Sequence, residues 1–198
     1  MNKELHKWNA SRGDETYRLN YKLNENSIVF DLGGYRGEWA QKIYDRYGCN
    51  IHVFEPHPEF SKNLYDKFGD NKKITVYDFG LYTKTTTTKL SDTGSSSSII
   101  TSDDGVDVKL VDIVTFLKNI NISRVDLIKI NIEGSEYELI DHLYQNDLLQ
   151  KFDNLQIQFH HEQFENYEEL ISACREMLSQ THKMTWCFNW VWENWGNV

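Results

Sequence analysis

The chain has 198 residues, which is enough for a single domain with a complete hydrophobic core. Its hydrophobic fraction of 39% and charged fraction of 26% are those of a globular protein, and no apolar run is long enough to span a membrane. The formal net charge of −9 argues against non-specific binding to nucleic acid, which needs a basic surface, and favours a neutral or cationic small ligand.

The cysteines and the amino terminus predict a reducing compartment. Cys49, Cys174 and Cys187 are scattered without metal-ligand spacing, and an odd count does not suit a framework of disulfides. The first residues of the chain lack the apolar core of a signal peptide. We therefore expect a cytoplasmic protein with no membrane span.

One domain covering residues 1–198 is predicted, with two segments that depart from the regular pattern. Residues 1–26 are polar and mixed, and we expect a helical or irregular segment that covers one side of the core. Residues 83–105 contain runs of threonine and of serine, typical of either a solvated excursion or a flexible flap. No repeat or linker indicates a second domain, and the sequence does not indicate an oligomeric state.

Elsewhere, short apolar strands alternate with amphipathic helices. The first half of the chain predicts strands at 27–32, 50–55 and 73–79, with helices at 37–48 and 58–69. The second half predicts a strand passing into a short helix over 106–117, strands at 127–133, 155–161 and 183–189, and helices at 135–149 and 164–180. This alternation favours an α/β fold with a parallel sheet.

The first strand leads into a glycine-rich turn of the kind that binds nucleotides. Asp31 ends the strand, and Gly33, Gly34 and Gly37 precede the first helix of the α/β pattern. Glycine permits positive φ and close approach of a ligand, and a helix amino terminus offers free N–H groups. Glu55 ends the next strand, where a carboxylate can accept both hydroxyls of a ribose.

The order of acid and glycines separates two classes of ligand. Dinucleotide sites prefer G-x-G-x-x-G, which lets a pyrophosphate lie on the helix amino terminus. Here Asp31 comes immediately before the turn, where it would repel pyrophosphate and favour an ammonium group. S-adenosylmethionine has an amino-acid end, a ribose and no phosphate. The spacing therefore predicts this methyl donor and disfavours a nicotinamide-dependent oxidoreductase.

Three segments resemble the motifs of the FkbM-type methyltransferases. They are Phe30–Gly37, Val53–Pro58 and Leu127–Glu136, and the resemblance extends over residues 27–180. It implies a Rossmann-like fold with a mostly parallel seven-stranded sheet and helices on both faces. It also implies O-methylation with S-adenosylmethionine, most often of a sugar, glycan or glycosylated natural product.

The resemblance also assigns residues to the donor site. By the family pattern, Asp31, Gly33 and Glu55 bind the donor, and we include Gly34 and Gly37 of the same turn. Asn131 stands where the family usually has aspartate, and we place it in the donor site as well. The change from aspartate to asparagine argues against a charged base or a metal ligand at this position.

Polar residues recur at every second position in two of the predicted strands. They are Lys129, Asn131 and Glu133 in one strand and Gln156, Gln158 and His160 in the other. Central parallel strands are normally apolar on both faces. The pattern predicts either a wet or ligand-lined face, or a partly exposed face at the edge of the sheet.

Candidate catalytic residues follow from the same two strands, which we expect to lie beside the strand that ends at Asp31. In open α/β sheets the ligand binds beyond the carboxyl ends of the strands. His160 is ranked ahead of His161 as general base, because histidine titrates near neutral pH and His160 lies on the polar stripe. Glu133 is expected to orient the acceptor or the base.

No metal is expected in the site. Hard cations need several converging carboxylates, and the acidic candidates nearest to Glu133, Asp103 and Asp104, lie in the 83–105 segment. Two alternatives stay open at this stage, a metal-dependent O-methyltransferase of the catechol type and a non-catalytic module that keeps the fold.

The carboxyl-terminal segment is rich in tryptophan, with Trp186, Trp190, Trp192 and Trp195 close together. Packing in the core or at an edge strand is the ordinary explanation. The alternative is a surface on which the apolar face of a sugar ring stacks.

Overall fold

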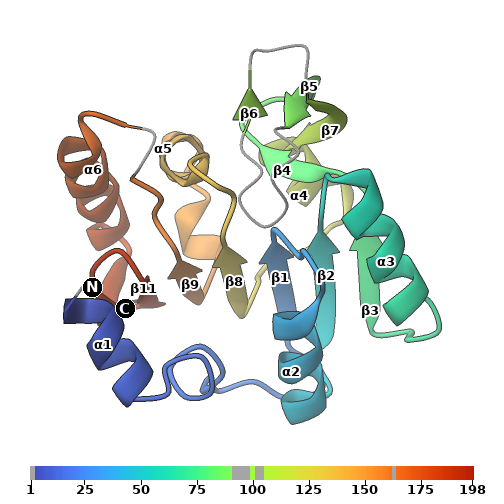
Figure 1. The fold of residues 1–198 in the computed structure, drawn as a ribbon, viewed down its shortest axis with the longest axis horizontal. Helices are drawn as coiled ribbons and strands as arrows, with labels where there is room; N and C mark the ends of the chain where they lie inside the picture. Colours follow the sequence, from blue (N-terminus) through green and yellow to red (C-terminus); the bar gives the residue numbers. More distant parts are fainter. Residues whose placement is uncertain (1–2, 91–98, 101–104, 162–163) are drawn as a thin grey trace.

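A seven-stranded sheet forms the centre of the computed structural model, which describes residues 3–90, 99–100, 105–161 and 164–198. The strand order is β10-β11-β9-β8-β1-β2-β3 (Figure 1). The pairs β1–β2, β2–β3, β1–β8 and β8–β9 are parallel, whereas β11 is antiparallel to both of its neighbours, β9 and β10. The predicted α/β fold with a mostly parallel seven-stranded sheet is therefore confirmed.

The elements of the first half agree with the predicted ones as far as β3, whereas β4 and β5 lie where no strand is predicted. The first half comprises α1 (Lys3–Ala10), β1 (Ile28–Leu32), α2 (Glu38–Tyr47), β2 (Asn50–Phe54), α3 (Pro58–Phe68), β3 (Ile74–Tyr77), β4 (Gly80–Tyr82) and β5 (Thr86–Leu90). The second half comprises β6 (Ile99–Ile100), β7 (Val106–Asp112), α4 (Ile113–Asn119), β8 (Leu127–Ile130), α5 (Glu136–Gln145), the 3-10 turn η2 (Leu149–Lys151), β9 (Asn154–Ile157), α6 (Tyr167–Ser179), β10 (His182–Phe188) and β11 (Trp192–Asn197).

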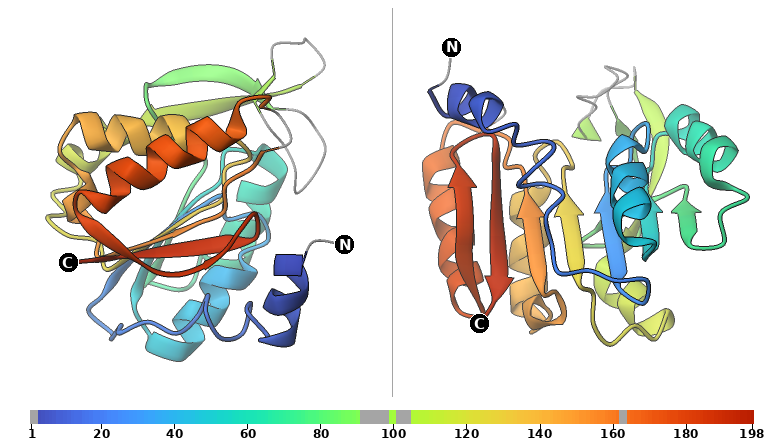
Figure 2. Two further views of the ribbon diagram at one scale, coloured as in Figure 1. Left: turned by 90° about the vertical axis from the view of Figure 1, so that its left-hand side faces the viewer. Right: turned by 90° about the horizontal axis from the view of Figure 1, so that it is seen from below.

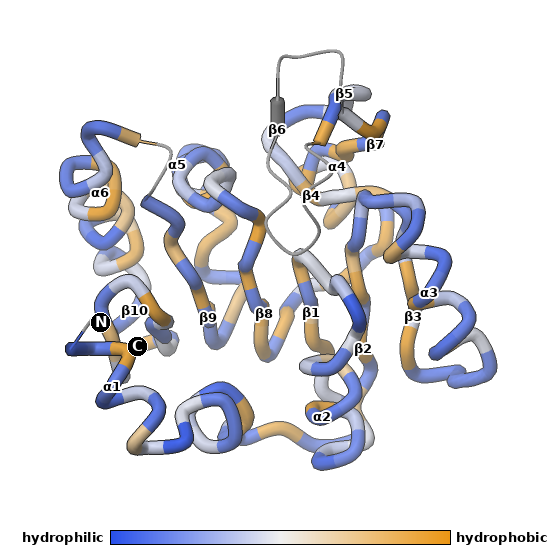
Figure 3. Tube along the Cα trace, viewed as in Figure 1, coloured by the Kyte–Doolittle hydropathy of each residue, from blue (hydrophilic) through white to orange (hydrophobic). Residues whose placement is uncertain are grey.

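The chain reverses its direction of travel across the sheet at β1. It runs outward from β1 through β2 to β3, and then returns to place β8 on the other side of β1. This switch in strand order opens a crevice at the carboxyl ends of β1 and β8, which is where ligands bind in such sheets. Figure 3 shows that β1, β3 and β8 consist mainly of hydrophobic residues.

The two faces of the sheet carry separate hydrophobic clusters. Val29 of β1 and Val53 of β2 pack with side chains of α2 and α3. Phe30 and Leu32 of β1 point to the opposite face, where they pack with α4, α5 and α6. Figure 2 shows α5 and α6 on one side of the sheet and α1 and α2 on the other.

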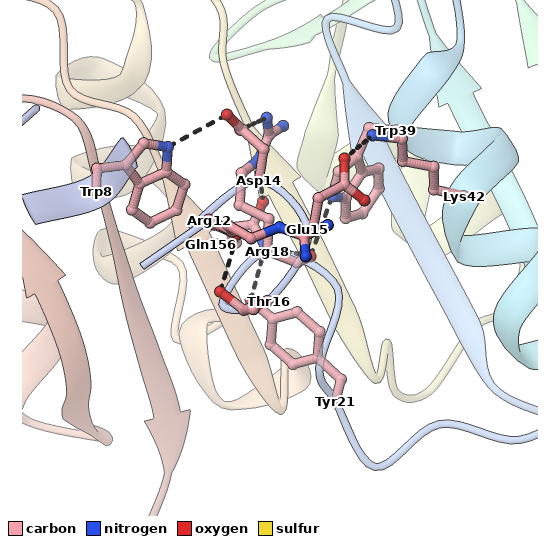
Figure 4. Close-up of polar contacts among 10 residues, drawn as sticks. All are labelled: Trp8, Arg12, Asp14, Glu15, Thr16, Arg18, Tyr21, Trp39, Lys42 and Gln156. Atoms are coloured by element: carbon pink, nitrogen blue, oxygen red, sulfur yellow. Dashed lines mark hydrogen bonds and ion pairs between the residues drawn. The ribbon is translucent and has the colours of Figure 1, made fainter. Parts of the chain in front are cut away.

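The amino-terminal segment lies over the polar side chain of Gln156, and this corrects one prediction. Gln156 is completely buried, and its Nε2 donates to the carbonyl oxygen of Arg18 at 3.0 Å and to the hydroxyl of Tyr21 at 2.7 Å (Figure 4). The Nε of Arg18 in turn donates to Gln156 Oε1 at 3.2 Å. The expected wet or ligand-lined face is thus wrong at this position, because a strap of chain supplies the polar partners.

Two strands end earlier than predicted. β8 ends at Ile130 and β9 at Ile157, so Asn131, Glu133 and His160 lie on loops beyond the sheet. β8 lies beside β1 as expected, but β9 pairs with β8 and is separated from β1 by it. The strand that leads to His160 is therefore one position farther from Asp31 than the sequence suggested.

Part of the 83–105 segment belongs to a second sheet, of strand order β4-β7-β5-β6. Thr86–Leu90 pairs antiparallel with β7, and the threonine run suits a strand because threonine is β-branched. Residues 91–98 and 101–104, which include Asp103 and Asp104, lie outside the described residues. The role of the segment as a flap stays a prediction.

The tryptophans of the carboxyl-terminal segment pack largely as core. Trp192 and Trp195 are buried in β11, which is an interior strand of the sheet and not an edge. Trp186 lies partly buried against Trp8 of α1, with ring centroids 6.0 Å apart. None of the helices that the structure describes is both long and apolar enough to cross a bilayer.

Gly33 provides a test of how closely β1 and β8 approach. Its φ is +79°, and a Cβ at this position would lie 2.1 Å from the carbonyl oxygen of Asn131. Gly48 also has positive φ, +59°, but a Cβ there would meet nothing within 4 Å. We expect Gly48→Ala to cost about 1–2 kcal/mol of unfolding free energy, from the left-handed backbone alone. Gly33→Ala should cost a further ~1–3 kcal/mol from the clash.

Chemical denaturation of both variants measures this difference. Equal destabilisation by the two substitutions would mean that the two loops separate freely to admit a methyl group.

Candidate active site

A cavity lies at the carboxyl ends of β1, β2 and β8 and is lined in part by the small sheet. Figure 1 shows the small sheet above these strand ends. Its empty volume is about 740 Å³, a figure that includes the solvent space at the open mouth of the cavity. Four segments supply the lining: the turn after β1, the loop after β2, the small sheet, and the loop after β8. Loops from adjacent parallel strands converge here because the chain reverses direction at β1.

Glu55 lines this cavity and is held rigidly at the end of β2. Its Oε2 accepts the backbone N–H of Tyr35 at 2.8 Å, and its Oε1 accepts that of His57 at 2.9 Å. The side chain is buried, and burial raises the pKa of the carboxyl, although the two N–H groups oppose this shift. The carboxylate therefore connects the glycine turn to the start of α3 and presents its remaining lone pairs to the cavity.

Asp31 is not among the residues that line the cavity. Register pairs it with Lys129 of β8, and Lys129 Nζ lies 2.8 Å from Asp31 Oδ1 with both side chains buried. The same ammonium group donates to the carbonyl oxygen of Gly33 at 2.7 Å. Asp31 Oδ2 is buried and has no hydrogen-bond partner among the described residues. The predicted donor contact of Asp31 thus rests on this one oxygen.

The three glycines of the turn have different roles. Gly33 lines the cavity and allows β1 to approach Asn131. A Cβ on Gly34 would lie 2.3 Å from Val53 Cγ1, and one on Gly37 would lie 2.5 Å from the ring of Phe68. Gly34 and Gly37 are therefore required for packing of the turn against β2 and α3, and neither lines the cavity.

Asn131 lines the cavity as well. Its Oδ1 is buried and has no hydrogen-bond partner in the described part of the chain. A buried acceptor without a partner is costly, so a ligand that brings a donor group gains by pairing with it. Within the residues that the structure describes, Asp31 Oδ2 of β1 is a second buried acceptor without a partner, although Asp31 does not line the cavity.

The loop after β8 is organised by Glu136, a residue that the sequence analysis did not single out. Glu136 is fully buried, and its two oxygens accept the backbone N–H groups of Ile132 at 2.8 Å and of Gly134 at 2.9 Å. Its Oε1 also lies 2.9 Å from His160 Nδ1. These bonds shape a turn in which Glu133 has a φ of +53° and lines the cavity.

His160 lies between two carboxylates, and this corrects its predicted role. Its Nε2 is 3.3 Å from Glu133 Oε1, on the side opposite to Glu136. Burial lowers the pKa of His160, but the hydrogen bonds and charges of Glu133 and Glu136 outweigh it and raise the pKa to about 10. An imidazolium at neutral pH has no lone pair with which to accept a proton. The geometry therefore moves the base assignment, which stays a prediction, from His160 to Glu133.

His161 lies apart from this group. Its ring is 4.7 Å from that of Trp190 and 5.5 Å from that of Tyr167, and it does not line the cavity. The aromatic contacts give His161 a packing role at the start of α6. Its predicted catalytic role has no support from this placement.

Several aromatic residues line the cavity without being among the predicted site residues, and Tyr35, His57 and Phe60 are three of them. The available signal was their position, since Tyr35 lies within the glycine turn and the other two follow Glu55 within five residues. Among the described residues, no group of three or more His, Cys, Asp or Glu side chains could hold a metal ion. The requirement for a metal stays a matter for a chelator assay.

The contact of His160 with two carboxylates predicts a dependence of stability on pH. The pKa rises from about 6.5 in the unfolded chain to about 10 in the folded protein, so the stabilisation is fully present below about pH 6.5. It is lost progressively as pH rises through the folded value. We expect the difference in unfolding free energy between the wild type and His160→Gln to shrink as pH increases over that range.

Denaturant titrations of both proteins at several pH values measure this difference in unfolding free energy. The contributions of titrating groups that both proteins share cancel in the difference. A difference that stays constant across the range would show that His160 is not held as an imidazolium.

Comparison with solved structures places the fold among methyltransferases. A putative rRNA-methylase from Clostridium thermocellum matches with a TM-score of 0.59 at 9% identity, covering 96% of this chain and 95% of that one. The fibrillarin pre-rRNA processing protein of Methanococcus jannaschii matches with a TM-score of 0.56 at 13% identity, covering 96% and 75%. M. capricolum TrmK, determined with S-adenosylhomocysteine, matches with a TM-score of 0.52 at 12% identity, covering 89% and 64%.

The family is established by sequence. No curated protein sequence matches the chain. The model of the methyltransferase FkbM domain matches residues 31–184, which is most of the chain and includes the glycine turn, Glu55 and the loop after β8. The chain therefore belongs to the family of FkbM-domain methyltransferases, with S-adenosylmethionine as its methyl donor.

Proposed function

We propose that this methyltransferase methylates a hydroxyl group of a sugar or glycan. The lining of the cavity carries the proposal: no lysine or arginine is present among its described residues, which include Tyr82, Asn131, Glu133 and Ser135 beside apolar side chains. Hydroxyl, amide and carboxylate groups suit the hydroxyls of a sugar, and the apolar side chains suit its C–H face. RNA phosphates are held by lysine and arginine, so this lining and the net charge of −9 do not favour an RNA acceptor.

The residues present fit the methyl donor. Glu55 would hold the ribose hydroxyls, and Asn131 Oδ1, a buried acceptor on the cavity lining, suits the ammonium of the amino-acid end. Asp31 Oδ2, which is buried and does not line the cavity, stays the proposed second acceptor for that group. When bound, S-adenosylmethionine supplies a methyl group on a cationic sulfonium, which is a good leaving group. The carboxylates that surround the cavity favour a cation there.

Glu133 is the candidate for the proton of the acceptor hydroxyl. It lines the cavity on the loop after β8, and His160 at 3.3 Å holds its carboxylate. Glu136 fixes both the loop and the imidazolium. Glu133 would orient the hydroxyl and take its proton as the new O–C bond forms, a contribution of about 10²–10⁴-fold to the rate. Alignment of the two reactants supplies the rest.

We also propose that the enzyme works in the cytoplasm. Cys49, Cys174 and Cys187 are all free thiols in the described structure, as a reducing compartment would keep them. Burial raises the pKa of each thiol, which keeps all three unreactive at neutral pH.

The donor site is tested at Glu55. Because Glu55 holds two backbone N–H groups, removal of the side chain would disturb the fold, and Glu55→Gln is the smaller change, which keeps the shape and one of the two acceptors. A charge-assisted hydrogen bond contributes about 1.5–3 kcal/mol, so we expect S-adenosylhomocysteine to bind roughly 10- to 150-fold more weakly. Calorimetric titration measures this, with Glu59→Gln as the control at an exposed position on α3. Wild-type affinity in Glu55→Gln would remove Glu55 from the ribose site.

The reaction is tested with acceptors of two classes. Methyl transfer from labelled donor to a panel of sugar glycosides is compared with transfer to short RNA, and the site of methylation is located by NMR. We expect O-methylated sugar, with a rate reduced by about 10²–10⁴-fold in Glu133→Gln at unchanged affinity for S-adenosylhomocysteine. Transfer to RNA but to no sugar would overturn the acceptor class. A wild-type rate in Glu133→Gln would overturn the base.

A further inference from the structure

Two residues with a Cβ have a left-handed backbone at the border of the cavity, and one of them is aromatic. Tyr35 has a φ of +48° and Glu133 a φ of +53°. For a bulky side chain this conformation is a genuine outlier. Such strain persists only where the surroundings impose it, and it concentrates at functional sites. The hydrogen bonds of Glu136 account for the left-handed backbone of Glu133. The proposed catalytic groups do not account for the left-handed backbone of Tyr35.

The turn around Tyr35 is held from several sides. Its backbone N–H donates to Glu55 Oε2 at 2.8 Å. Lys67 of α3 donates to the carbonyl oxygens of Arg36 at 3.0 Å and of Gly37 at 3.2 Å. The guanidinium carbon of Arg36 lies 5.1 Å from the centroid of the Tyr35 ring. These contacts keep both the backbone and the ring of Tyr35 in one place.

The ring of Tyr35 belongs to an aromatic group beside Glu55. Its centroid is 4.7 Å from that of Phe60, and the Phe60 centroid is 4.5 Å from that of His57. All three side chains line the cavity. The backbone N–H groups of Tyr35 and His57 are the two that Glu55 accepts, so the rings and the carboxylate form one unit. A carboxylate flanked by aromatic rings suits a ribose that carries a flat base.

We propose that Tyr35 is a specificity-determining residue of the donor site, forming with Phe60 and His57 an aromatic wall against which the adenine base packs. The left-handed backbone places the ring beside Glu55, so a nucleoside reaches the wall and the carboxylate together. Glycine at this position would relieve the backbone strain but remove the ring. This inference rests on S-adenosylmethionine as the donor and is independent of the acceptor.

The test compares Tyr35→Gly with Tyr35→Phe by calorimetric titration of S-adenosylhomocysteine and of adenosine alone. Loss of base stacking lowers binding affinity by roughly 5- to 150-fold. We expect Tyr35→Gly to lower the affinity for both probes by a similar factor in that range. Tyr35→Phe should recover most of the loss, because the ring is retained. Asp147→Gly is the matched control, since Asp147 has a φ of +54° on an exposed loop away from the cavity.

Three results would overturn the proposal. They are wild-type affinity in Tyr35→Gly, a loss for S-adenosylhomocysteine without a loss for adenosine, and a loss in Tyr35→Phe equal to that in Tyr35→Gly. If Tyr35→Gly does not fold, the same titrations are made with Tyr35→Asn, because asparagine tolerates the left-handed backbone without supplying a ring. No readout uses an acceptor, so failure here would leave the proposed O-methylation standing.

Discussion

A lysine and an aspartate are buried side by side between the two central strands, and the position of the cavity depends on this pair. Lys129 lies opposite Asp31 in the register of β8 and β1, with 2.8 Å between Nζ and Oδ1. Removing one partner of such a pair typically costs about 3–5 kcal/mol, because the other charge is left without compensation. A shift in the register of β8 against β1 would also leave both charges without a partner. The second contact of Lys129, to the carbonyl oxygen of Gly33, extends the constraint into the glycine turn.

Buried carboxylates fix the loops around the cavity relative to these strands. Glu55 fixes the turn after β1 against the start of α3 by accepting two backbone N–H groups. Glu136 fixes the loop after β8 in the same way, with His160 as a third donor. Each loop also contains one left-handed residue with a side chain, Tyr35 or Glu133, whose backbone strain these bonds can sustain. Some of the carboxylates that contribute to the net charge of −9 are therefore buried and hold loops by hydrogen bonds.

What the sequence predicted correctly is what depends on local pattern. The helices, most strands of the main sheet and the strand-end position of Glu55 follow from periodicity and glycine placement. The sequence pattern did not predict β11, or the strands β4, β5 and β6 of the small sheet. The partners of Asp31 and Gln156 lie 98 and 138 residues away in sequence, at Lys129 and Arg18, and only the folded arrangement reveals them. The surroundings of His160 were hidden for the same reason, since its two partners, Glu133 and Glu136, follow a different strand of the sheet.

The two carboxylates that line the cavity differ in what they can contribute to a reaction. Glu55 is buried and fixed by backbone donors, and the ribose it is proposed to hold is unchanged during transfer, so its interaction is equal in the ground and transition states. Such uniform binding improves affinity and leaves the rate constant of the bound complex unaltered. On the proposed function, Glu133 faces a proton whose acidity increases as the hydroxyl oxygen bonds to carbon. Its interaction therefore strengthens only along the reaction, which makes its positioning by His160 and Glu136 the part of the structure that bears on the rate.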